Sequence, residues 1–82
     1  MVFVYLLKSQ KDNGYYIGQT DDVDLRLVRH REGGVDATKY RLPVDLVYYE
    51  AYPSREKAVE RELKLKQFGS AYVGLLKRLG LR

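Results

Sequence analysis

Two segments rich in β-forming residues flank a short run of turn-forming residues near the start of the chain. The segments are Val2–Leu7 and Tyr15–Thr20, and the turn sequence between them is Lys11-Asp12-Asn13-Gly14. Asn-Gly favours a tight turn because both residues tolerate positive φ. The chain is therefore predicted to begin with an antiparallel hairpin, and the remaining elements must pack against it.

Capping residues divide the rest of the chain. Residues 20–22 offer an N-cap and first-turn acids for a helix that reaches about His30, and two glycines at 33–34 end it. Residues 35–42 are predicted to form a polar loop, and residues 44–52 a third strand.

Two further helices are expected after that strand. Ser54 is the predicted N-cap of a helix running to about Phe68, and Ser70 can cap a third helix. Apolar residues of the third helix follow the i, i+3, i+4, i+7 spacing: Tyr72, Leu75, Leu76 and Leu79. The order β-β-α-β-α-α predicts an α+β fold, in which helices in layers flank a small three-stranded antiparallel sheet.

Length and composition set limits on the class of protein. With 82 residues, the chain is expected to form one domain spanning 1–82. The absence of cysteine excludes disulfides and cysteine-bound zinc. No signal peptide or membrane span is readable, so we expect a cytoplasmic protein that does not enter membranes and is a monomer or weak dimer.

Basic residues are concentrated in the second part of the chain. Residues 1–50 carry seven Lys/Arg and eight Asp/Glu, a balance of −1, whereas residues 51–82 carry eight and three, a balance of +5. No acid follows Glu62, and the later cations are Lys64, Lys66, Lys77, Arg78 and Arg82. Such an end attracts polyanions, of which nucleic acid is the usual one.

Glu62 is predicted to lie on the apolar face of its helix, although an acidic side chain is normally exposed to water. When the helix is projected at about 100° per residue, Glu62 falls within the apolar face of Ala58 and Leu65, whereas Glu60 falls opposite. A carboxylate on that face must be paired, protonated or bound to a cation. Lys66, one turn on, is either its partner in a structural ion pair or a contact for phosphate.

The first helix and the hairpin each add two polar groups beside the core. Arg26 and His30, at i and i+4, flank the apolar stripe and point the same way. If Lys8 pairs with Tyr15 across the turn, Tyr5 then faces Gly18, and alternation places Tyr5, Leu7, Tyr16 and Gly18 on one side of the sheet. Gly18 would leave open space beside Tyr5.

Taken together, these residues resemble the GIY-YIG nuclease family, and in particular small bacterial members related to the nuclease of excision repair. The YIG half is matched by Tyr16-Ile17-Gly18, followed by Thr20-Asp21-Asp22-Val23, Arg26 and His30. The later match comprises Leu46-Val47-Tyr48-Tyr49-Glu50, Ser54, Ala58, Glu62 and Lys66. The resemblance departs in two places: the GIY half reads Phe3-Val4-Tyr5, and no asparagine follows Asn13.

The resemblance implies an endonuclease that hydrolyses DNA with one Mg²⁺ or Mn²⁺, in repair or recombination. It assigns the catalytic positions to Tyr5, Tyr16, Arg26, His30 and Glu62, with Glu62 as the metal ligand and Tyr5 as the group that deprotonates water. Gly18 matches the glycine of the YIG half. We expect Gly18, Lys64, Lys66, Lys77 and Arg78 to contact DNA.

Two other functions fit the same residues. The first is a weak or inactive nucleic-acid-binding module that obtains substrate affinity from a partner protein. The second is a small interaction domain in which Glu62 forms a structural ion pair with Lys66 or Arg26. Replacing Glu62 by glutamine separates the three readings.

Overall fold

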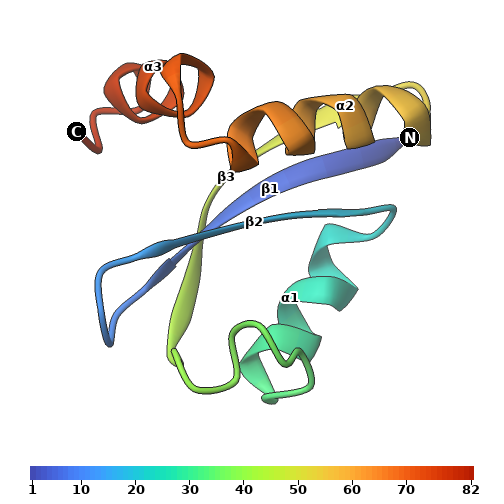
Figure 1. The fold of residues 1–82 in the computed structure, drawn as a ribbon. Coiled ribbons are helices and arrows are strands. Elements are labelled where there is room, and N and C mark those ends of the chain that lie inside the picture. The colour runs from blue at the N-terminus through green and yellow to red at the C-terminus, as the bar shows by residue number, and fades with distance from the viewer.

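The computed structural model describes residues 1–82, which form a three-stranded antiparallel sheet with helices on both faces (Figure 1). The sheet order is β2-β1-β3, so the first strand of the chain lies in the middle. The elements are β1 Val2–Ser9, β2 Tyr15–Thr20, α1 Val23–Arg31, β3 Val44–Tyr52, α2 Arg55–Lys66 and α3 Ser70–Arg78. The predicted order β-β-α-β-α-α and the α+β class are confirmed. None of the helices is long and apolar enough to cross a membrane.

The hairpin has the register that was assumed for it in placing Tyr5 and Tyr16 on one side of the sheet. Lys8 pairs with Tyr15 and Tyr5 pairs with Gly18. Asn13 supplies the turn with a positive φ of 59°. The first strand is two residues longer than predicted because Ser9 still pairs with β3 at Val44.

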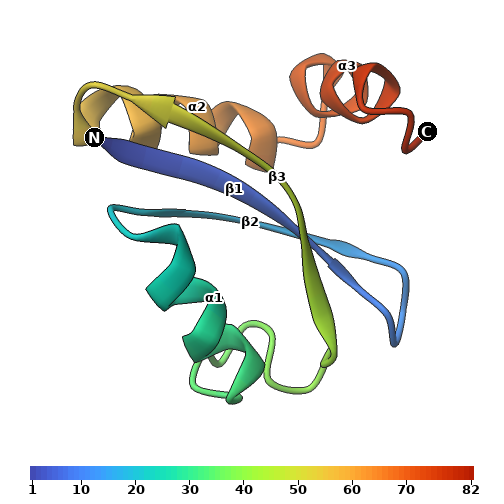
Figure 2. The same cartoon turned by 180° about the vertical axis from the view of Figure 1, so that it is seen from behind.

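The sheet separates two unequal cores. The larger core lies between the sheet and α2 with α3 and includes Val4, Leu6 and Leu65. The smaller lies on the α1 side and contains Tyr5, Leu7 and Val44, with Tyr16 packed against it. Figures 1 and 2 show α1 below the sheet and the other two helices above it. Alternation along β1 and β2 therefore directs Tyr5 and Tyr16 toward α1.

Two of the three predicted helix caps are confirmed. The carboxylate of Asp22 accepts a hydrogen bond from the Leu25 amide, and Ser54 accepts one from the Lys57 amide. The prediction for Ser70 was wrong: Ser70 is the first residue of α3, and the cap position is Gly69, which has no side chain to accept a hydrogen bond. The second helix also ends at Lys66, before Phe68.

The segment between α1 and β3 is more than the polar loop that the sequence predicted. Val35 and Thr38 within it are buried. Arg41 joins it to the hairpin, because its Nε donates to Asp12 at 3.1 Å and its carbonyl accepts a hydrogen bond from the Ser9 hydroxyl at 2.6 Å. These contacts hold the segment against the end of the sheet where the small core lies.

Candidate active site

The hydroxyl of Tyr5 is the meeting point of β1, β2 and α1. It lies 2.9 Å from Nε2 of His30 and accepts a hydrogen bond from Nε of Arg26 at 3.4 Å. Below it is Gly18 on β2, where an added Cβ atom would collide with the Tyr5 ring and hydroxyl. The space that Gly18 leaves is thus filled by Tyr5 itself. The glycine allows the phenol to lie flat across the neighbouring strand and reach α1.

His30 is fully buried. The helical projection had placed it only at the margin of the core. Its ring packs edge-on against the rings of Tyr5 and Tyr16, with centroids 5.7 and 5.2 Å away. Its Nδ1 lies 2.6 Å from the hydroxyl of Thr38, which is also buried. No sequence pattern pointed to Thr38, because a threonine in an irregular segment belongs to no periodic arrangement.

The hydrogen bonds are consistent with one protonation pattern for this row of groups. Arg26 can only donate, so the Tyr5 oxygen accepts from it and can direct its own proton to Nε2 of His30. A neutral imidazole that accepts at Nε2 carries its proton on Nδ1, which then donates to the Thr38 hydroxyl. In this arrangement, every buried polar atom of the row has a partner.

Burial keeps both Tyr5 and His30 neutral. It raises the pKa of Tyr5 to about 12, although the hydrogen bond from Arg26 works in the opposite direction. Nearby Tyr16 and Glu62 raise that pKa further. Burial, and then the positive charge of Arg26, lower the pKa of His30 to about 4. At neutral pH the pair is therefore a neutral phenol beside a neutral imidazole whose unprotonated Nε2 faces the phenol.

Glu62 reaches this group of residues from the opposite layer. Helix α2 packs on β1 and β2, and its Lys66 places Nζ 5.9 Å from the centroid of the Tyr16 ring. The same Nζ lies 3.3 Å from Oε2 of Glu62, whose side chain is 15% exposed. The predicted inward position of Glu62 is confirmed, and so is the ion pair with Lys66, one of the two alternatives for this carboxylate.

A second half-buried carboxylate, that of Glu50, has hydrogen-bond partners on both of its oxygens and serves as a comparison for Glu62. Glu50 on β3, 19% exposed, accepts a hydrogen bond from Arg61 at 2.7 Å, and its other oxygen accepts from Tyr48 and Tyr52. Glu62 has only Lys66, whose flexible side chain is 43% exposed. Glu62 therefore keeps much more capacity to bind a cation.

The residues fit a cation held through a single carboxylate. No group of three or more His, Cys, Asp or Glu residues is arranged so that it could hold a metal ion. A site built on Glu62 alone suits Mg²⁺, which keeps several waters and uses one or two carboxylates with substrate phosphate. It does not suit zinc, which takes three or four protein ligands.

Of the residues that were predicted to contact DNA, only some lie near Tyr5. Lys66 and Gly18 do, as described above. Arg78 instead donates to the Tyr48 hydroxyl on β3, at the other edge of the sheet. Lys64 lines a shallow groove with Arg61 on that same side. Lys77, adjacent to Arg78 on α3, is exposed.

Comparison with known proteins gives one consistent answer. The family model of the GIY-YIG catalytic domain matches residues 1–75. A UPF0213 protein of Staphylococcus epidermidis is 40% identical over 67 residues, and one of Staphylococcus haemolyticus is 43% identical over 67 residues; each match covers 80% of both chains. The solution NMR structure of a UPF0213 protein from Bacillus halodurans is similar, with a TM-score of 0.58, 36% identity, and coverage of 96% of this chain and 85% of that one. The chain therefore belongs to the GIY-YIG family.

Proposed function

We propose that this protein is a metal-dependent endonuclease that hydrolyses phosphodiester bonds in DNA, with DNA repair or recombination as its setting. Membership of a family of nucleases supports the reaction class. The observation that carries the proposal is the position of the Tyr5 hydroxyl, between neutral His30 and cationic Arg26. A water beside Tyr5 could lose its proton there while Arg26 holds the phosphate.

Tyr5 passes a proton on and does not act as a phenolate. With a pKa of about 12, it is almost never ionised at neutral pH. It can accept a proton from water only if its own proton moves to Nε2 of His30, 2.9 Å away. A phosphate bound at Arg26 offsets the charge that lowers the pKa of His30, and so makes the imidazole a better acceptor.

Three further groups bind and orient the substrate. Arg26 is half-buried and has guanidinium nitrogens besides the Nε that donates to Tyr5, so it can contact the scissile phosphate. Tyr16 packs beside His30 and Tyr5 and would orient the water or phosphate by hydrogen bond. Lys66 lies over the Tyr16 ring and would bind a neighbouring phosphate.

Glu62 is the residue that would hold the metal. A bound Mg²⁺ or Mn²⁺ would stabilise the charge that develops at phosphorus and at the leaving oxygen. Lys66 pairs with Oε2 of Glu62, so the other carboxylate oxygen would remain available to a cation, and a DNA phosphate would offer the ammonium group a further partner.

Glu62→Gln tests the proposal, with Glu60→Gln as the matched control on the same helix. Glu60 is exposed and pairs only with Lys57 at 3.5 Å. Nicking of supercoiled, single-stranded and branched DNA is measured with Mg²⁺ and with Mn²⁺. We expect loss of at least about 100-fold in Glu62→Gln, near wild-type activity in Glu60→Gln, and unchanged thermal unfolding in both.

Two other outcomes identify the competing functions. If the wild-type protein binds DNA and cuts none of the substrates at saturating metal, the protein is a binding module and the proposal is wrong. If Glu62→Gln lowers the unfolding temperature and neither protein binds DNA, the Glu62–Lys66 contact is purely structural. Isothermal titration of Mn²⁺ into the two variants separates these outcomes from a simple loss of metal affinity.

A further inference from the structure

An exposed aromatic pair lies where α2 ends and α3 begins. Phe68 is 58% exposed, and its ring meets that of Tyr72 edge-on, at 90° with centroids 5.0 Å apart. Tyr72 packs in turn against the larger core. One ring of the pair is thus anchored, and the other is presented to the surface.

The backbone holds Phe68 in that position at a cost. Its φ is 55°, in the left-handed region that residues with a Cβ rarely adopt. In this conformation the Cβ atom lies too close to the following carbonyl oxygen, so the backbone there is strained. The Phe68 amide donates to the Leu65 carbonyl at 3.0 Å, which closes the end of α2. The ring is therefore displayed by an ordered turn.

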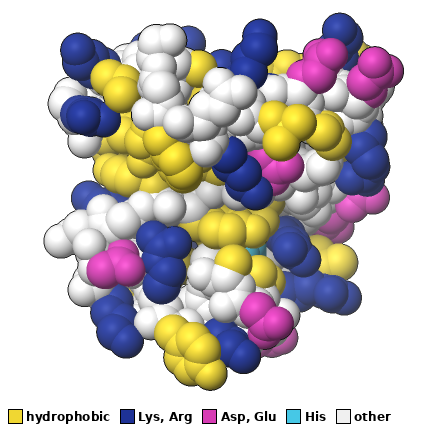
Figure 3. Space-filling model, in the orientation of Figure 1, with side chains coloured by type: hydrophobic (Ala, Val, Ile, Leu, Met, Phe, Trp, Pro, Cys, Tyr) yellow, Lys and Arg dark blue, Asp and Glu magenta, His cyan; other side chains and the backbone are white.

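Cations lie next to Phe68 in the chain or act on Tyr72, and one of them, Lys66, reaches the candidate active site. Lys66, two residues before Phe68, lies over the Tyr16 ring. Arg82 and Arg41 are close enough to Tyr72 to act on its hydroxyl electrostatically. Figure 3 shows hydrophobic side chains interspersed with Lys and Arg side chains in the upper half of this face, where α2 and α3 lie.

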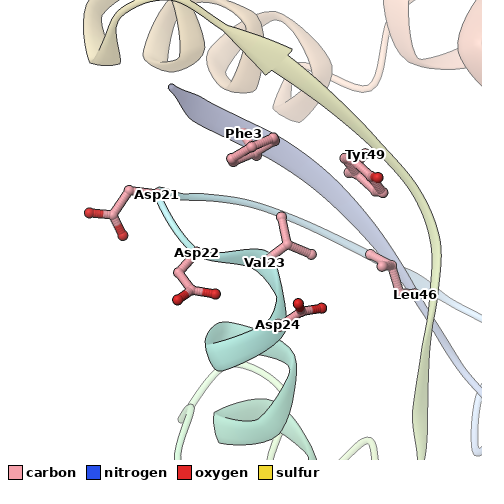
Figure 4. Close-up of a pocket in the computed structure, with 7 residues that line it drawn as sticks. All are labelled: Phe3, Asp21, Asp22, Val23, Asp24, Leu46 and Tyr49. Atoms are coloured by element: carbon pink, nitrogen blue, oxygen red, sulfur yellow. The ribbon is translucent and has the colours of Figure 1, made fainter.

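A second exposed aromatic pair has the same geometry and the opposite charge around it. Phe3 and Tyr49 also meet edge-on, with centroids 6.0 Å apart, and Tyr49 is 54% exposed. They line a shallow pocket of about 290 Å³ whose remaining lining includes Asp21, Asp22 and Asp24 (Figure 4). The three carboxylates repel a polyanion, so this pair does not suit DNA.

We propose that Phe68, backed by Tyr72, is a stacking platform for an unpaired base of single-stranded DNA next to the bond that is cut. An aromatic ring flanked by cations is the usual means of binding single strands, because every unpaired base has an exposed face and every linkage a charge. Bases inside a duplex are stacked on both faces and cannot use such a ring. The proposal rests on the proposed nuclease function and narrows its substrate to DNA with a single-stranded segment beside the cut.

Binding without metal tests the platform separately from cleavage. Fluorescence anisotropy with EDTA present compares a labelled single strand with its duplex. We expect the wild-type protein to prefer the single strand, and Phe68→Leu to weaken single-strand binding by about 10-fold with little change for duplex. Phe68→Tyr should keep the preference, because it retains the ring.

Tyr49→Leu is the matched control, since it removes an equally exposed ring from the acidic pocket and should leave both affinities unchanged. Equal wild-type affinity for the two DNA forms, no effect of Phe68→Leu, or equal losses in Phe68→Leu and Tyr49→Leu would overturn the platform. Thermal unfolding confirms that the variants are folded. If the protein prefers single-stranded DNA through Phe68 but cleaves no DNA, only the nuclease proposal is wrong. If it cleaves DNA but has no preference for the single strand, only the stacking platform is wrong.

Discussion

Nε2 of His30 lies 2.9 Å from the hydroxyl oxygen of Tyr5, and this contact joins the first strand to the first helix across the small core. Both groups are buried and neutral, and each is held by a second partner, Thr38 for the imidazole and Arg26 for the phenol. A row of four polar groups thus crosses the apolar layer between the sheet and α1. These four groups hold the layer together, and in the proposed reaction the proton of the attacking water would pass from Tyr5 to His30.

Stability should depend on pH through His30, the only histidine in the chain. Its pKa is about 4 in the folded protein against an ordinary value of 6.5, so between these values the unfolded chain binds more protons. The free energy of unfolding should therefore be fully present above about pH 6.5 and fall as the pH drops toward 4, by up to about 3 kcal/mol. Urea unfolding at a series of pH values measures this slope. His30→Gln should flatten it above pH 5, and a wild-type curve that is already flat there would contradict the assignment.

Thr38→Val should destabilise the protein although it preserves shape. The variant removes the hydroxyl that lies 2.6 Å from Nδ1 of His30 and leaves that buried nitrogen without a partner. An unsatisfied buried polar group costs about 1–3 kcal/mol. Thr38→Ser keeps the hydroxyl and should recover most of the loss. Chemical denaturation gives the energies, and the ¹⁵N shifts of the imidazole report whether the Nδ1-protonated tautomer persists; equal stability of the two variants would rule out the role of Thr38.

Two glycine-to-alanine substitutions should change the free energy of unfolding in opposite directions. In Gly18→Ala the new methyl group meets the ring of Tyr5, so the ring must move away from His30. We expect about 1–3 kcal/mol of destabilisation from overpacking, together with reduced DNA cleavage. Gly74 lies inside α3 with nothing within 4 Å of an added Cβ. Gly74→Ala should stabilise by about 0.5–1 kcal/mol, and a loss of stability there would show that α3 has another constraint.

Arg61→Met should affect stability and spare activity. It removes the 2.7 Å partner of Glu50 and leaves that half-buried carboxylate with only the Tyr48 and Tyr52 hydroxyls. A hydrogen bond between charged groups contributes about 1.5–3 kcal/mol. Because both side chains are partly exposed, the loss in the free energy of unfolding should lie near the lower end of that range. Lys57→Met, which breaks an exposed pair with Glu60, is the control and should cost less than about 0.5 kcal/mol. Loss of DNA cleavage in folded Arg61→Met would contradict the assignment of Glu50 to structure.

The parts of the molecule that follow local rules could be predicted from the amino-acid sequence. Turn chemistry at Asn13-Gly14 indicated the hairpin, and the register assumed for it, with Lys8 opposite Tyr15, is the one that forms. Side-chain alternation then put Tyr5 over Gly18, and helical periodicity put Glu62 on the inner face of α2. These predictions succeeded because periods of two and 3.6 residues are properties of the backbone and need no knowledge of the partner element.

The tertiary structure decided the contacts made by irregular segments. Thr38 reaches His30 because the ends of its segment are fixed by α1 and by β3, and Arg41 is held by the hairpin for the same reason. After α2 ends at Lys66, Phe68 adopts a left-handed backbone conformation, and α3 begins at Ser70, one residue earlier than a Ser70 cap would give. Side chains in such segments have no period to read. Their positions depend on the packing of residues far away in the chain, which only the folded molecule brings together.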